Sequence, residues 1–315
     1  MRHIASIDIG GTKIAAGVVS EDGQLESRVE IPTQPEAGFP FTLRRLREVI
    51  RSMVAQGHKL EGIGIGCPGP LNPLTGILGD VGTLPTWKNG DLVTDLEQEF
   101  GLSVAVENDA DAAALAEYAW GCAIGVPNYI YVTLSTGIGA GIVLGGQLYR
   151  GVDGSHPEVG HQLIDPSGPL CYCGLRGCWE SLASGVALES WVQEQRPMSL
   201  RLTAREICEL ARQDNELAQR AMERLTRYVG FGLANLVTLF SPDLLSLGGG
   251  LMRSSDLFFE KATGLVQEVC TQVPVHKVRI VPTALHADVG LLGAAQSWLH
   301  RHRSTPPSAP RGAPA

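Results

Sequence analysis

Two glycine-rich turns, each between β-rich runs, constrain the fold of this chain more than any other feature. The first follows HIASIDI and precedes TKIAAGVV, and Asp22-Gly23 then leads into LESRVEI. Asp-Gly between such runs is a strong hairpin signal, so we predict a three-stranded meander over residues 3–31. Residues 129–149, YIYVTLSTGIGAGIVLGGQLY, repeat the order of strand, glycine-rich turn and strand. We therefore predict two similar halves facing a common anion, although residue identity between them is too low to prove a duplication.

Both turns have the composition of a phosphate-binding loop. Glycines let backbone N–H groups approach a phosphate, and an Asp at the end of a strand can hold water on a divalent cation. A plain hairpin turn is the alternative. A third glycine run ends the strand in LLSLGGGL, residues 244–251, at a predicted helix start suited to nucleotide contacts. The candidate contacts to a nucleotide and its cation are Asp8, Gly10, Gly11, Thr12, Lys13, Ser135, Thr136, Gly137, Gly139, Gly249 and Gly250.

A carboxylate stands where a strand meets a helix in VAVENDADAAALAEYAWG. The pattern predicts a strand to Val106 and an alanine-rich helix to Trp120, which places Asp109 at or beside a helix N-terminus. Such an Asp is either a helix cap or a carboxylate presented at a cleft. LEGIGIGCPGPL is predicted to be a buried strand that ends in a loop, and the glycine- and proline-rich run continues through Asn89. That run either lines a ligand or makes a tight structural connection.

Residues 156–180, HPEVGHQLIDPSGPLCYCGLRGCWE, have the composition of a metal site. His161, Cys171, Cys173 and Cys178 have the spacing H-x9-C-x-C-x4-C. Three thiolates and one imidazole suit tetrahedral zinc and leave no open coordination position, so we predict a structural metal. Ordering this loop would also order two acids, Glu158 and Glu180, whose alternative is a solvated surface position. His156 either contacts the ligand or is exposed to solvent, and the sequence favours neither alternative.

Composition limits the class of protein. A chain of 315 residues is long enough for two domains, and its net charge of −8 disfavours a broad surface for nucleic acid or membrane. Seven cysteines without an export signal favour thiols and a metal site over disulfides, so we expect a cytoplasmic protein. Apolar spacing predicts helices at 41–56, 202–213, 216–240 and 289–300, a last strand in VRIVPT, and a disordered tail over 304–315.

Taken together, these motifs resemble the ROK family of sugar kinases, and most closely its ATP-dependent, zinc-containing glucokinases. DIGGTKIAAGVV and LSTGIGAGIV resemble the family's two phosphate motifs, VENDADAAALAE its catalytic segment, and PEVGH through CYCGLRGCWE its signature and zinc knuckle. LGGG is similar to the adenosine-contact motif. The resemblance implies an α/β, actin-like ATPase (ribonuclease H-like) fold with two α/β domains and a central cleft. We expect a small domain over 1–110, completed by a helix at about 287–302, and a large domain over 111–286.

The resemblance also implies roles for particular residues. Asp109 would be the catalytic base, His161 both a sugar contact and a zinc ligand, and Asp8 a contact to Mg²⁺ through water. The implied cofactors are ATP, Mg²⁺ and structural Zn²⁺. The candidate sugar contacts are Gly69, Asn89, Asn108, Asp109, Glu158, His161 and Glu180.

The predicted reaction is transfer of the γ-phosphoryl group of ATP to the 6-hydroxyl of a hexose, with glucose the first candidate. His156-Pro157 is similar to the family's fructokinase branch, which leaves fructose open beside mannose and N-acetylhexosamines. Alternatives from another class are a non-catalytic sugar sensor and a transcriptional regulator; we expect no DNA-binding domain, since the first phosphate motif begins at Asp8. The partners expected are the hexose and ATP, no nucleic acid, no membrane, and other copies of the chain in a homodimer or homotetramer.

Overall fold

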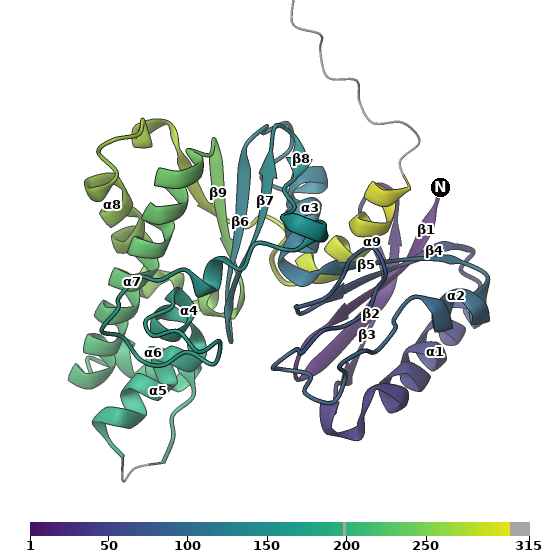
Figure 1. Cartoon of the computed structure of the whole chain (residues 1–315), viewed down its shortest axis with the longest axis horizontal. Helices are drawn as coiled ribbons and strands as arrows, with labels where there is room; N and C mark the ends of the chain where they lie inside the picture. The colour runs from purple at the N-terminus through teal and green to yellow at the C-terminus, as the bar shows by residue number, and fades with distance from the viewer. Residues whose placement is uncertain (198–199, 303–315) are drawn as a thin grey trace, which may run out of the picture. The chain divides into compact units, whose positions relative to one another are not determined.

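The computed structural model describes residues 1–197 and 200–302; the predicted tail over 304–315 lies outside the described residues. The chain folds into two compact units. Unit 1 contains Met1–Ala112 and, of the described residues, 290–302, and unit 2 contains Ala113–Val289. In Figure 1, unit 1 takes the purple and blue start of the chain together with its yellow end.

Unit 1 is built on a five-stranded sheet in the order β3-β2-β1-β4-β5. Strands β1 (His3–Ile9), β2 (Lys13–Ser20) and β3 (Leu25–Pro32) pair antiparallel, which confirms the predicted meander. Strands β4 (Leu60–Cys67) and β5 (Ser103–Asn108) then continue the sheet in parallel with β1. The prediction that β5 ends at Val106 was two residues short, because the strand stays paired with β4 through Asn108.

Unit 2 repeats this arrangement. Strands β6 (Tyr129–Leu134), β7 (Ile138–Leu144) and β8 (Gln147–Leu148) form an antiparallel meander. Strands β9 (Leu244–Gly248) and β10 (Arg279–Pro282) extend it in parallel from β6. The order β8-β7-β6-β9-β10 matches that of unit 1 strand for strand. The two halves predicted from the glycine turns are therefore similar in topology.

In unit 1, helix α1 (Phe39–Ala55) buries an apolar stripe against the sheet and starts two residues before its predicted position. Helix α2 (Thr94–Phe100) precedes β5, and α3 (Asp109–Trp120) follows it directly. The last helix, α9 (Val289–Arg301), confirms the C-terminal helix predicted from the apolar spacing. The chain passes from unit 1 to unit 2 within α3.

Unit 2 contains most of the remaining helices. Thr203 caps α6 through a capping box with Glu206, so α6 starts at Ala204, two residues after its predicted start. The segment after the third glycine run is the 3-10 helix η4 rather than an α-helix. The α-helices of unit 2 are α4 (Trp179–Ala183), α5 (Gly185–Gln195), α6 (Ala204–Arg212), α7 (Glu216–Phe240) and α8 (Phe259–Val269). The 3-10 helices within the described residues are η1 (Pro35–Ala37), η2 (Val152–Gly154), η3 (Val159–His161), η4 (Gly250–Leu257), η5 (Val275–Lys277) and η6 (His286–Asp288).

Each unit has its own apolar core. In unit 1 the buried side chains of β1, β2 and β4 pack against α1, and Trp87 is fully buried among them. In unit 2 the strands pack against α5 to α8, with Trp179 fully buried. Among residues 1–197 and 200–302, no helix combines the length and apolar character that a membrane crossing requires.

Alternate glycines in β4 let α9 lie directly against the strand. A Cβ at Gly64 would stand 1.9 Å from the carbonyl oxygen of Ala294, and one at Gly62 would stand 2.0 Å from the indole of Trp298. The same indole N–H donates to the carbonyl of Ser103 at 3.0 Å, which ties α9 to the neighbouring strand. The close approach of α9 therefore depends on the missing side chains of β4.

We predict that Gly64→Ala destabilises the protein by about 2–3 kcal/mol, because the new methyl group meets backbone that cannot rotate away. Thermal and denaturant unfolding followed by circular dichroism would measure the change. Gly82→Ala is the matched control in unit 1, since a Cβ there meets nothing within 4 Å. Equal unfolding midpoints for the two variants would show that α9 can move away at little cost.

Candidate functional site

The candidate residues of unit 1 gather where three parallel strands end. Asp8 of β1 is paired in register with Gly66 of β4, and Cys67 of β4 is paired with Asn108 of β5. Asp109 follows Asn108 immediately, as the first residue of α3. The carboxyl ends of parallel strands are where α/β sheets bind ligands. The sheet thus brings Asp8, Asn108 and Asp109 to the same edge.

Asn108 supplies most of the cap of α3. Its side-chain oxygen accepts hydrogen bonds from the backbone N–H groups of Ala110, at 2.9 Å, and of Asp111, at 3.3 Å. One carboxylate oxygen of Asp109 also accepts from Ala110, at 2.8 Å. The sequence left open whether Asp109 caps the helix. In the structure, buried Asn108 accepts two of the first N–H groups of the helix and Asp109 accepts only one. Asp109 is half-buried at the helix N-terminus, where backbone dipoles stabilise a negative charge.

Asp8 is held in an environment that opposes its ionisation. Burial, followed by the nearby negative charge of Asp109, raises the pKa of the Asp8 carboxyl to about 7. Glycines make room for it: a Cβ at Gly290 would stand 2.2 Å from one carboxylate oxygen, and one at Gly66 would stand 3.7 Å from the other. A buried carboxyl beside a second negative charge forms a place where a divalent cation would favour the ionised form of Asp8. The donor set therefore fits the predicted Mg²⁺.

The first glycine turn is closed by backbone hydrogen bonds. The N–H of Gly10 donates to the carbonyl of Lys13 at 2.9 Å, and Thr33 supports the turn by donating its hydroxyl to the carbonyl of Gly10 at 2.6 Å. The exposed ammonium of Lys13 lies 2.8 Å from the Glu30 carboxylate. A phosphate that recruits Lys13 must therefore compete with this exposed ion pair. Gly11 and Thr12 complete the turn, with Thr12 exposed.

Two further candidates of unit 1 lie in loops. Gly69 comes two residues after the end of β4, so it stands near the strand ends that carry Asn108. Asn89 is exposed, has a left-handed backbone (φ 64°), and donates its N–H to the carbonyl of Leu78 at 2.9 Å. The left-handed backbone at position 89 favours Asn for structural reasons alone, and the role of Asn89 in sugar binding stays a prediction.

In unit 2 the second glycine turn is joined to Glu180 of α4. One Glu180 carboxylate oxygen accepts from the backbone N–H of Ile138 at 2.8 Å, and a Cβ at Gly137 would stand 2.3 Å from that oxygen. Ser135 closes the turn by donating its N–H to the carbonyl of Gly137. Thr136 is exposed, and Gly139 already belongs to β7.

The third glycine run lies beside the second turn. A Cβ at Gly249 would stand 2.3 Å from the carbonyl oxygen of Leu134, and one at Gly250 would stand 3.6 Å from the Ser135 hydroxyl. Unit 2 therefore brings Ser135, Gly249 and Gly250 together, as a common nucleotide site requires.

Glu158 and His161 are positioned by the one-turn helix η3. Gly160 lies so close to β7 that a Cβ would stand 2.2 Å from the carbonyl oxygen of Ile138, the residue whose N–H holds Glu180. Glu158, His161 and Glu180 thus all gather around the start of β7. Glu158 is exposed, and His156 is half-buried in the preceding loop.

The predicted metal ligands converge. The donor atoms of His161, Cys171, Cys173 and Cys178 lie within 4.8 Å of one another. Cys171 Sγ is 3.6 Å from His161 Nδ1, and Cys173 Sγ is 3.5 Å from Cys178 Sγ. Tetrahedral bonds of about 2.3 Å to sulfur and about 2.0 Å to nitrogen give ligand edges of about 3.5–3.8 Å. This set of donors therefore fits a tetrahedral metal such as zinc.

The loop around the metal ligands is more regular than its sequence suggests. It has no strand of its own, but isolated bridges pair Leu163 with Cys178 and Leu170 with Arg176. Gly177 has a left-handed backbone (φ 71°), and a Cβ there would stand 1.5 Å from the carbonyl oxygen of Asp165. A metal would therefore complete a loop that hydrogen bonds already shape.

The sequence did not identify Tyr172, which lies between two of the metal ligands. Its hydroxyl is 3.0 Å from Nε2 of His161. Burial of the hydroxyl and the negative charges of Glu180 and Glu158 raise the pKa of Tyr172 above its usual value. The signal available in the sequence was an aromatic residue between two cysteine ligands. The structure adds that this residue is exposed, so it has no packing role in the core.

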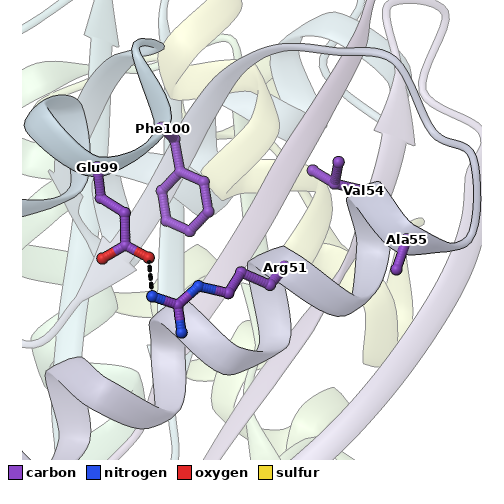
Figure 2. A pocket seen from close by; sticks show the side chains of 5 residues that line it. All are labelled: Arg51, Val54, Ala55, Glu99 and Phe100. Atoms are coloured by element: carbon purple, nitrogen blue, oxygen red, sulfur yellow. Dashed lines mark ion pairs between the residues drawn. The ribbon is translucent and has the colours of Figure 1, made fainter.

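A surface hollow elsewhere in unit 1 carries none of the candidate residues. Figure 2 shows this hollow, of about 460 Å³, with Arg51, Val54 and Ala55 of α1 on one side and Glu99 and Phe100 of α2 on the other. The Arg51 guanidinium lies 2.5 Å from the Glu99 carboxylate. That ion pair neutralises the polar part of the hollow, which therefore offers no reacting group.

Comparisons with known proteins agree with the motifs. The model of the ROK family matches residues 4–301. A glucokinase of Thermotoga maritima is 33% identical over 93% of this chain and 96% of its own length. A ROK hexokinase structure from Thermus thermophilus is 37% identical and has a TM-score of 0.80 over 95% of this chain and 99% of that one. A ROK glucokinase from Streptomyces griseus, solved with glucose and AMPPNP, is 34% identical with a TM-score of 0.79 over 93% and 98%. The predicted actin-like ATPase fold is confirmed.

Relatives of similar identity have other functions. A xylose repressor of Bacillus subtilis is 30% identical over 92% of this chain and 75% of its own length. An N-acetylmannosamine kinase of Escherichia fergusonii is 32% identical over 92% and 96%. The likeness alone therefore leaves the substrate open.

We predict that Asp8→Asn stabilises the Mg²⁺-free protein increasingly as the pH rises. In the unfolded chain Asp8 ionises above its ordinary value of 3.8, whereas in the folded protein it ionises only near pH 7. The wild type therefore loses stability between about pH 4 and 7, and the neutral amide does not. The advantage of Asn should grow by about 2–3 kcal/mol from pH 5 to pH 8 and then level off.

Urea unfolding at pH 5, 6, 7 and 8 without added Mg²⁺ would measure this difference. Exposed Asp80→Asn is the control and should show no such trend. A constant difference between Asp8→Asn and the wild type across this range would contradict the strained carboxylate pair.

We predict one tightly held metal ion per chain, lost in Cys178→Ser. Burial raises the pKa of Cys178 to about 12, so a cation is needed to hold it as a thiolate at neutral pH. Elemental analysis of purified protein would count the metal. Cys122→Ser, outside the cluster, is the control and should keep it. Equal metal content in both variants would rule out Cys178 as a ligand.

Proposed function

Because the chain belongs to the ROK family, we propose that it is an ATP-dependent hexokinase that phosphorylates the 6-hydroxyl of a hexose, with glucose preferred. The observation that carries this proposal is the half-buried pair of Asp8, near the end of β1, and Asp109, at the start of α3, next to a glycine turn. The glucokinase relatives and the knuckle CYCGLRGCWE support glucose among the hexoses.

Asp109 is proposed to orient the hydroxyl and to receive its proton. The O6–H bond breaks, O6 bonds to the γ-phosphorus, and the bond from that phosphorus to the bridging oxygen breaks, so that ADP leaves. Phosphoryl transfer passes through a loose transition state in most analyses, so positioning matters more than base strength. A carboxylate stabilised at a helix N-terminus is a weak base, and it suffices when it takes the proton late.

The glycine turns are proposed to hold the nucleotide. Backbone N–H groups near Gly10 and Gly11 and near Ser135 to Gly137 would bind phosphate oxygens, while Gly249 and Gly250 would admit the adenosine. Mg²⁺, when bound, neutralises phosphate charge, and Asp8 would hold it through water. The strain on ionised Asp8 supports this assignment, because a cation favours the charged form of the carboxyl.

The metal loop, residues 156–180, is proposed to position side chains for sugar binding rather than to take part in phosphoryl transfer. Four protein ligands leave zinc no open position for a reacting water, so the metal would act by ordering Glu158, His161 and Glu180. These side chains, with Asn108, would accept or donate hydrogen bonds to sugar hydroxyls.

A second candidate function is sugar-responsive regulation without turnover. The xylose repressor relatives favour it, since their likeness covers nine-tenths of this chain. The acidic pair and the two glycine turns favour catalysis, because sugar binding alone needs no cation site.

The deciding experiment is release of ADP from ATP across glucose, fructose, mannose, N-acetylglucosamine and N-acetylmannosamine, with kcat/KM for each. We expect the highest kcat/KM with glucose. Absence of turnover with every sugar, together with measurable sugar binding, would support the regulatory function instead.

We predict that Asp109→Asn lowers kcat for the best hexose by about 10²–10⁴-fold, because the amide orients the hydroxyl but cannot take its proton. The Kd for the sugar should stay within about threefold, as measured by calorimetry, since the amide keeps its hydrogen-bonding capacity. Asp95→Asn changes an Asp in the first turn of another helix, α2, and should leave both constants unchanged. Turnover near that of the wild type in Asp109→Asn would remove Asp109 from this role.

A further inference from the structure

Tyr172 lies on the metal loop with little to hold its ring. The residue is 78% exposed, and its ring meets that of His161 edge to face, with centroids 5.0 Å apart and planes at 85°. Its hydroxyl nevertheless lies 3.0 Å from His161 Nε2. A polar contact rather than packing therefore sets the direction of this side chain.

His161 has only one nitrogen to offer a substrate. Its Nδ1 lies toward the cluster, 3.6 Å from Cys171 Sγ, so a metal would take that atom. A metal-bound imidazole keeps one N–H, here at Nε2, and normally donates it to an oxygen. In this structure the oxygen is that of Tyr172. The Nε2–H of His161, which the proposed function assigns to a sugar hydroxyl, is thus already bonded to the Tyr172 hydroxyl in the sugar-free protein.

Glu180, the other proposed sugar contact near the start of β7, has a backbone partner: one carboxylate oxygen accepts from the Ile138 N–H at 2.8 Å. The phenol oxygen of Tyr172 can accept the N–H of His161 while its own O–H remains available to donate. A sugar hydroxyl has the same donor and acceptor, so it can take the place of the phenol at His161.

We propose that the Tyr172 hydroxyl is a stand-in for a hexose hydroxyl in the sugar-free protein, and that the substrate binds by displacing it. This inference rests on the proposed sugar contacts of His161 and Glu180. The ring can turn outward without leaving a cavity, because most of it is already exposed to solvent. The apparent affinity for sugar is reduced by the fraction of molecules in which the phenol occupies the site. Tyr172 thereby sets the sugar concentration at which the site fills.

The test is Tyr172→Phe, which removes the hydroxyl and keeps the ring. We expect the Kd for glucose, measured by calorimetry without ATP, to fall about three- to tenfold, as loss of one competing hydrogen-bonded contact allows. KM should fall in parallel while kcat stays within about twofold, and the metal content should not change. Mannose should gain by the same factor if it binds at this site, because the substitution acts on the sugar-free state. Tyr149→Phe, the same change at another exposed tyrosine of unit 2, is the control and should leave Kd unchanged.

Three outcomes would overturn the inference. An unchanged Kd would show that the phenol does not compete, and a raised Kd would show that it contacts the bound sugar. Loss of metal in Tyr172→Phe would show that the hydroxyl supports the metal site instead. Each differs from failure of the proposed function, in which the wild type itself turns over no hexose.

Discussion

Burial of Asp8 beside the negative charge of Asp109 is the constraint on which the candidate site of unit 1 depends. Parallel pairing of β1, β4 and β5 places the two acids at one sheet edge, and burial makes the ionised state of Asp8 costly. Gly66 and Gly290 leave the space that the carboxylate needs, and Gly290 belongs to a helix almost the whole chain away in sequence. A fold that keeps Asp8 buried beside Asp109 loses stability at neutral pH, and a bound cation would offset that loss by favouring the ionised carboxyl.

The packing of α9 on β4 follows from the same requirement. The helix can bring Gly290 against Asp8 only because Gly64 allows its backbone to touch the strand. Trp298, further along α9, then fixes its position by a hydrogen bond to Ser103. Glycines that a sequence-based view assigns to an ordinary buried strand are therefore the means by which the last helix completes the site.

Much of this could be predicted from the sequence, because the informative signals were local. Strand and turn patterns gave both meanders, and the spacing of one histidine and three cysteines gave a cluster whose donors do converge. The capping of α3 by Asn108 was missed, since cap and catalytic carboxylate are adjacent and either residue type can serve. The pairing of Lys13 with Glu30 and the approach of Gly290 to Asp8 were missed for another reason: both depend on register or packing between segments that no local pattern relates.

The metal loop places a double demand on His161. If Nδ1 binds a metal, Nε2 becomes a fixed donor whose direction is set by the cluster, so the same ligand bond that orders the loop also aims the remaining N–H. Glu180 is fixed in a comparable way, because one of its oxygens is held by the turn before β7. A donor and an acceptor that cannot adjust to the substrate discriminate among hydroxyl positions, but they also need a partner when the site holds no sugar. Tyr172, which lies between two cysteines of the cluster, supplies such a partner to His161.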